Sequence, residues 1–119
     1  MKQRFVISGR LAGYNELHKV NWRASHRIKQ NAMETVKWAA WSAHIKPVKG
    51  RCVVTIACYE PNARRDPDNV KTGANKVILD ALQQMGILAG DGRKYIKDVV
   101  NPRVTVDRVF PRVEVIIED

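Results

Sequence analysis

The stretch that decides the fold is CVVTIACYEPNARRDPDNVKTGANKVILDALQQM, residues 52–85. Its first part, residues 52–59, is rich in β-branched side chains and predicts a buried strand. Residues 61–67 then predict a loop bounded by two prolines. In residues 69–85 apolar side chains recur at three- and four-residue spacing, which predicts an amphipathic helix that stops at Gly86. A strand, a loop and a helix therefore follow one another directly.

The segments on either side supply the rest of a small domain. Residues 4–8 predict a short strand, residues 10–21 an irregular loop, and residues 22–44 a second amphipathic helix free of Gly and Pro. Residues 95–107 and 112–118 predict two more strands, the first broken by Pro102. This order predicts one α+β domain over residues 1–119, in which two helices pack on a mixed sheet.

The composition indicates a globular protein with a polyanionic partner. The chain has 119 residues, 45% of them hydrophobic, and a formal net charge of +9. That excess of Lys and Arg favours nucleic acid, because no segment forms the basic amphipathic helix that binds a membrane surface. No run of about 18 apolar residues and no signal-peptide core is present, so we expect a cytoplasmic protein without membrane contact.

Two cysteines lie within the strand predicted over residues 52–59. Cys52 and Cys58 fall on one face of it, about 20 Å apart at about 3.3 Å per residue. This separation is too great for a disulfide, and two thiols alone do not make a zinc site. We expect both cysteines to be buried and structural.

An acidic pair, Asp66 and Asp68, interrupts the basic residues of the sequence RRDPDN. Pro67 favours extended geometry, in which residues two apart project to the same side. Two such carboxylates supply the hard oxygen ligands that Mg²⁺ prefers. The alternative is a turn in which Asp68 or Asn69 caps the following helix.

A third acid, Asp91, stands between two glycines in a turn after the helix. It joins the acidic pair only if the sheet folds it back there, which the sequence alone does not show.

Residues 64–98 resemble the RusA family of phage and prophage Holliday junction resolvases. The resemblance rests on R-R-D-P-D-N-V at residues 64–70 and K-V-I-L-D-A-L-Q-Q-M-G-I-L-A-G-D-G-R-K-Y-I-K-D at residues 76–98. The family is known by a D-x-D-N motif, a helix with a lysine and a D-A-L triplet, and a third acid after a turn. The resemblance implies a Mg²⁺-dependent endonuclease, with Mn²⁺ as a substitute, that cuts four-way DNA junctions symmetrically as a homodimer.

The same resemblance implies roles for particular residues. Asp66, Asp68 and Asp91 would bind the metal and be needed for cleavage. The family's essential lysine lies four residues before the D-A-L aspartate, which is Lys76. Counting forward from D-x-D-N gives Thr72 instead, because this chain carries four extra residues between the motifs. Lys76 is therefore our choice and Lys71 the reserve, while Asp80 of the D-A-L triplet is interpreted as structural.

Polar residues spread along the chain are candidates for DNA contact, although each alone is equally typical of a solvated surface. Trp38 and Trp41 are expected in the core or in a subunit contact rather than stacked on bases. The rival function is a non-catalytic nucleic-acid-binding module, and a further one is a structural partner in a phage assembly. The DNA-binding candidates are Arg10, Asn15, Lys19, Arg23, Arg27, Lys29, Arg64, Arg65, Asn69, Lys71, Arg93, Lys94 and Lys97.

Overall fold

The computed structural model describes residues 1–18 and 21–119, so the prediction for Lys19 lies outside the described residues. Three helices and a five-stranded mixed sheet form one small domain, which confirms the predicted α+β class. The elements in chain order are β1 (Lys2–Ser8), α1 (Tyr14–Leu17), α2 (Trp22–Ser42), β2 (Cys52–Glu60), α3 (Pro67–Gln84), β3 (Ile96–Val100), β4 (Thr105–Val106) and β5 (Arg112–Glu118).

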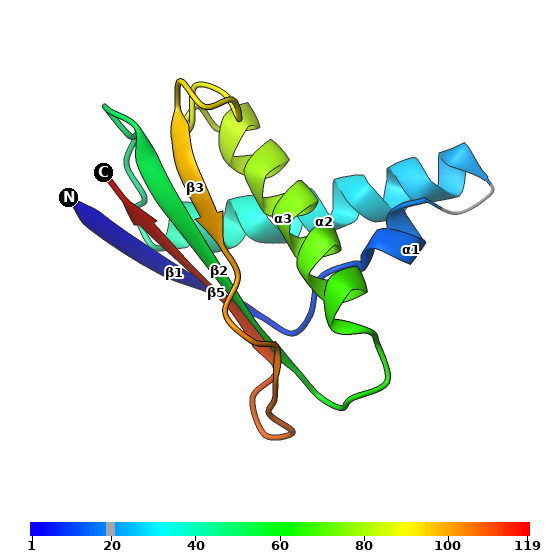
Figure 1. The fold of residues 1–119 in the computed structure, drawn as a ribbon. Coiled ribbons are helices and arrows are strands. Elements are labelled where there is room, and N and C mark those ends of the chain that lie inside the picture. The colour runs from blue at the N-terminus through cyan, green and yellow to red at the C-terminus, as the bar shows by residue number, and fades with distance from the viewer. Residues whose placement is uncertain (19–20) are drawn as a thin grey trace.

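The sheet is built around β2 and β5. Its strand order is β1-β5-β2-β3, and β4 extends the pairing along β2 where β3 has ended. β5 runs antiparallel to both of its neighbours, whereas β2 and β3 are parallel and α3 makes the crossover between them. This crossover places the start of α3 beside the end of β2 (Figure 1).

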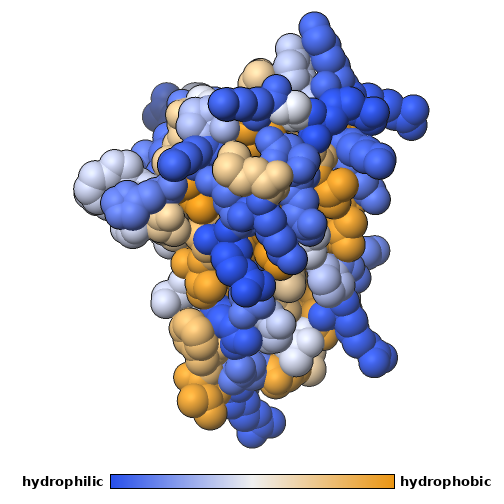
Figure 2. Space-filling model, turned by 90° about the vertical axis from the view of Figure 1, so that its left-hand side faces the viewer, coloured by the Kyte–Doolittle hydropathy of each residue, from blue (hydrophilic) through white to orange (hydrophobic). Residues whose placement is uncertain are grey.

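The core lies between the sheet and the long helices α2 and α3, which lie on the same side of it (Figure 1). Alternate residues of β2, from Cys52 to Glu60, are buried. This confirms that both cysteines are buried and that they form no disulfide. Seen from the side where the two termini lie, the surface is mostly hydrophilic, with hydrophobic residues in separate patches (Figure 2).

Two sequence predictions need correction. The loop predicted over residues 10–21 contains α1, a single turn too short to show helical periodicity, whose start is closed by a hydrogen bond from the Gly13 N–H to Glu16 Oε1 at 3.2 Å. The second long helix begins at Pro67 rather than at residue 69, because proline suits the first helical position. The break predicted at Pro102 is confirmed, since it separates β3 from β4.

The two tryptophans near the end of α2 are not in the core. Trp38 and Trp41 are 61% and 67% exposed, and their rings meet edge to face with centroids 5.5 Å apart. The expectation of a core position is therefore wrong, and the expectation of a subunit contact stays a prediction. No helix in the described residues is long and apolar enough to cross a membrane.

Candidate functional site

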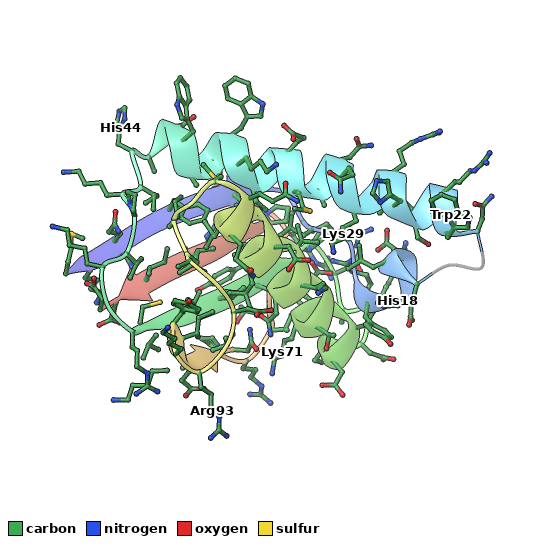
Figure 3. The ribbon with its side chains drawn as sticks, turned by 90° about the horizontal axis from the view of Figure 1, so that it is seen from above. His18, Trp22, Lys29, His44, Lys71 and Arg93 are labelled. Carbon is green, nitrogen blue, oxygen red and sulfur yellow. The ribbon has the colours of Figure 1, made fainter. Side chains whose placement is uncertain are left out.

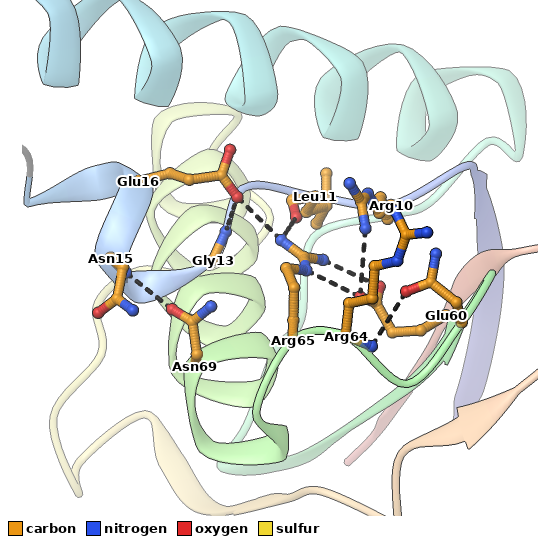
Figure 4. A network of polar contacts seen from close by, with 10 residues as sticks. Arg10, Leu11, Gly13, Asn15, Glu16, Glu60, Arg64, Arg65 and Asn69 are labelled. Atoms are coloured by element: carbon orange, nitrogen blue, oxygen red, sulfur yellow. Dashed lines mark hydrogen bonds and ion pairs between the residues drawn. The ribbon is translucent and has the colours of Figure 1, made fainter.

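The loop between β2 and α3 is held by Arg65, the residue just before Asp66. Its guanidinium binds both carboxylate oxygens of Glu60, with Nε to Oε1 at 2.8 Å and Nη2 to Oε2 at 2.9 Å (Figure 4). Its Nη1 donates to the Leu11 carbonyl at 2.9 Å and to Glu16 Oε1 at 3.0 Å. One side chain thus ties the end of β2 to the segment after β1 and to α1.

Glu60 and Arg65 form a buried ion pair. Their side chains are 4% and 13% exposed, so each charge has lost most of its contact with water and is compensated by its opposite charge. Burial alone would lower the pKa of Arg65, but the hydrogen bonds and charges of Glu60 and Glu16 raise it overall. With its donors engaged inside the protein, Arg65 holds the loop in place, and little of it remains for the DNA contact we predicted.

A second attachment fixes the first turn of α3. The Asn69 side chain accepts a hydrogen bond from the backbone N–H of Asn15 at 2.7 Å, so Asn69 does not cap its own helix (Figure 4). The backbone around Gly13 lies directly against Gly73, where a Cβ atom would come within 2.6 Å of Gly13 Cα. Gly73 is therefore needed for close approach rather than for a bend in the helix.

Asp66 and Asp68 stand at the start of α3 with their carboxylates exposed. Asp66 is the N-cap residue, and its backbone carbonyl accepts from the Val70 N–H at 3.1 Å, yet its side chain makes no capping bond. Asp68 lies in the first turn, where the helix dipole favours a negative charge. Within the described part of the chain, neither carboxylate has a hydrogen-bond or ion-pair partner.

Asp91 lies at the other end of α3. The helix has 18 residues, which corresponds to about 27 Å at 1.5 Å per residue. Asp91 follows it in the exposed turn that leads into β3, at the top of Figure 1. Residues 1–18 and 21–119 contain no group of three His, Cys, Asp or Glu side chains placed to hold one ion. Asp66 and Asp68 are thus two residues apart across the start of α3, and the extended geometry predicted for both holds only for Asp66, because the helix begins at Pro67. Asp91 lies at the other end of the helix.

The two candidate lysines project from different sides of α3. Lys76 Nζ lies 3.4 Å from Asp80 Oδ2, and that carboxylate also binds Lys29 of α2 at 2.6 Å. Asp80 thus has the structural role predicted for it, by linking the two long helices. Lys71 follows Asp68 by three residues and points away from α2 (Figure 3), so it is the lysine nearer to the acidic pair along the helix.

The remaining DNA-binding candidates fall at three places. Arg10 and Arg64 are exposed beside the Arg65 network, with Arg10 Nη1 3.8 Å from Glu60 Oε1 (Figure 4). The exposed side chains of Arg23 and Arg27 lie on the first half of α2. The third group surrounds the turn at Asp91 and comprises Arg93, Lys94 and Lys97.

Glu16 and Glu60 were missed as site residues by the sequence analysis. A signal for Glu60 existed, because it has the same parity as the buried residues of β2 and so had to face inward. An inward glutamate needs a cation, and Arg65 was five residues away. Glu16 gave no comparable signal, because the pattern did not reveal α1.

No family model matches the chain, and no curated protein matches it either. The resemblance to the RusA family therefore remains a prediction from residues 64–98.

Proposed function

We propose that this protein is a Mg²⁺-dependent endonuclease that cuts four-way DNA junctions and acts as a homodimer in the cytoplasm. The observation that carries the proposal is the exposed, unpartnered pair Asp66 and Asp68 on a braced helix start, in a chain of net charge +9. Adjacent carboxylates repel each other, and a bound cation removes that repulsion. A basic surface attracts a polyanion such as DNA, whose phosphates the bound cation would contact.

The donor set fits Mg²⁺, which takes hard oxygen ligands and is commonly held by one or two carboxylates and a substrate phosphate. When bound, the ion would supply a nucleophilic water and neutralise charge on the phosphoryl oxygens. Asp66 and Asp68 would hold it, and Lys71 or Lys76 would place a positive charge near the scissile phosphate. Arg10 and Arg64 would position the backbone of the strand.

A homodimer also accounts for Asp91. The rigid α3 keeps Asp91 away from the pair in its own chain, by about 27 Å of helix. In a twofold dimer that sets the end of α3 in one copy against the start of α3 in the other, each site contains Asp66 and Asp68 of one chain and Asp91 of its partner. Two such sites related by a twofold axis match the symmetric cutting of two strands.

The test is cleavage of an end-labelled four-way junction with Mg²⁺ and, as a control, with EDTA. We expect Asp66→Asn to slow cutting by about a thousandfold, on the scale of the several kcal/mol that a bound metal contributes. Junction binding should persist in this variant. The matched control is Asp98→Asn, which changes an exposed aspartate of β3 and should cut like wild type. Full activity of Asp66→Asn would overturn the proposal.

The position of Asp66 at the N-cap favours a second candidate, a nucleic-acid-binding module without catalysis. In that case the acids serve only to begin α3. The module predicts that the junction is bound but not cut, with Mg²⁺ or with EDTA.

A further inference from the structure

Exposed rings gather where α1 meets the first turns of α2. Tyr14 and Trp22 are 45% and 70% exposed. The His18 ring stacks on Tyr14 with centroids 4.1 Å apart and planes inclined by 28°. The Arg23 guanidinium lies 5.7 Å from the centre of the Trp22 ring. In Figure 3, His18 and Trp22 are at the same end of the molecule.

His18 and Trp22 border a shallow hollow of about 420 Å³, and Tyr14 lies beside it, stacked on His18. Its size falls within the range of about 300 to 1,000 Å³ that small-molecule sites occupy. The described residues that line it include no carboxylate, and the charged one among them is Lys29. The lining residues are Leu17, His18, Trp22, Ser25, His26 and Lys29.

The corner is attached to the same segment as the acidic pair. Tyr14 precedes Asn15, whose backbone N–H donates to Asn69 in the first turn of α3. Glu16, two residues after Tyr14, binds Arg65, the neighbour of Asp66. The rings and the acids are therefore held in a fixed relation by two short polar contacts.

We propose that this corner binds an unpaired nucleobase of the DNA, with Tyr14 and Trp22 as the stacking rings. The proposal rests on the proposed function, since it adds a base contact to that nuclease's substrate. Lys29 of the hollow is paired with Asp80, so the cation beside the rings is Arg23, and flat rings beside it complement a strand whose bases offer π faces and whose phosphates are negative. Arg23, directly after Trp22, and Arg27, on the next turn of α2, would contact those phosphates.

The exposed tryptophans at the far end of α2 make a useful contrast. Trp38 and Trp41 meet edge to face, and the groove they line also contains Glu34 and Lys37, whose charges pair at 3.6 Å. Rings that already contact each other edge to face leave less of their faces free for a base. This second pair therefore serves as an internal control.

The test uses the chain's own three tryptophans. The double variant Trp38→Phe, Trp41→Phe keeps Trp22 as the single emitter, and Trp22→Phe keeps the other two. Each is titrated with single-stranded oligothymidylate while the anisotropy of a labelled strand reports binding. We expect quenching of Trp22 emission on binding and unchanged emission from Trp38 and Trp41.

A second measurement uses Tyr14→Ala and Trp22→Ala, whose exposed side chains can be removed without opening the core. Each should weaken binding of single strand by about tenfold, the scale of one stacked base, and leave duplex binding within about twofold. A variant whose midpoint of thermal unfolding equals that of the wild type has an intact fold.

Several outcomes would overturn the proposal. One is that Trp22 emission stays constant when the oligothymidylate is saturating. Another is that emission is quenched equally in both tryptophan variants. A third is that the wild type does not bind the single strand. A dimer that dissociates on Trp22→Ala would assign the corner to a second copy of the chain. If junction cutting depends on Asp66 but not on Trp22, the base site is wrong and the proposed nuclease stands. Quenching of Trp22 without any Mg²⁺-dependent cutting defeats the proposed nuclease and leaves the base site standing.

Discussion

The two ends of α3 differ in how firmly they are held. At its start, Arg65 makes hydrogen bonds to three other residues, Asn69 accepts from Asn15, and Gly73 lies against the chain around Gly13. At its end, Asp91 sits in an exposed turn between Gly90, which lies against the Tyr95 ring, and Arg93, whose carbonyl accepts from Arg51 Nε at 2.9 Å.

This difference suggests a division of labour between the acids. A metal site needs ligands fixed by their surroundings, and the braced end meets that condition for Asp66 and Asp68. Asp91 lies on an exposed turn, where the proposed dimer would bring it against the partner's acidic pair. The predictions that follow compare the two ends, beginning with the largest expected effect.

Glu60→Gln should destabilise the braced end most. It removes the more buried of the two carboxylates that pair with the Arg65 guanidinium and leaves Glu16 Oε1 at 3.0 Å, so we expect a loss of about 3 kcal/mol, the lower end of what breaking a buried ion pair costs. Urea unfolding measures the loss. The matched control is Glu34→Gln, which breaks an exposed i,i+3 contact with Lys37 at 3.6 Å and should change stability by less than about 1 kcal/mol. Equal losses of stability in Glu60→Gln and Glu34→Gln would show that the Glu60–Arg65 pair stabilises the fold no more than an exposed contact does.

A glycine pair compares the packing at the two ends. Gly73→Ala places a Cβ atom against the backbone of Ala12 and Gly13, and such overpacking costs about 1 to 3 kcal/mol. Gly92→Ala, in the turn after Asp91, meets nothing within 4 Å and should leave stability unchanged or raise it by less than about 1 kcal/mol. Unfolding of both variants in urea checks this, and a neutral Gly73→Ala would contradict the close contact.

The smallest effect concerns pH. Burial, followed by the charge of Glu60, raises the pKa of Cys58 from 9.0 to about 11. The folded chain keeps the thiol proton that the unfolded chain loses, so this contribution to stability is full below pH 9 and is lost as pH rises towards about 11. Urea unfolding between these pH values should show the decline. Cys58→Ala should reduce its slope, and an unchanged slope would assign the decline to other groups.

The sequence predicted the long elements well because their periodicity is carried by many residues. The helix over residues 22–44 and the strand over 112–118 appear within two residues as α2 and β5. The α1 turn was not predicted, since four residues leave no periodic pattern and its start is closed by a hydrogen bond that Glu16 accepts from the Gly13 N–H.

The candidate site was only partly predictable. The extended geometry predicted for Asp66–Asp68 holds only for Asp66, because Pro67 begins α3 and puts Asp68 in its first helical turn. The separation of Asp91 follows from the parallel crossover and the length of α3, which motif spacing does not encode. Arg65 was interpreted as a DNA contact because its buried partner, Glu60, was not identified as inward-facing.

The most direct test of the account mixes two inactive proteins. Asp66→Asn and Asp91→Asn are combined under conditions of subunit exchange and tested on the labelled junction with Mg²⁺. If each site takes its acids from both chains, a mixed dimer contains one intact site and one with both substitutions. The mixture should then nick the junction at about a quarter of the wild-type rate, since about half of the dimers are mixed and each has one working site. No nicking, with subunit exchange verified by mass, would contradict a site shared between copies.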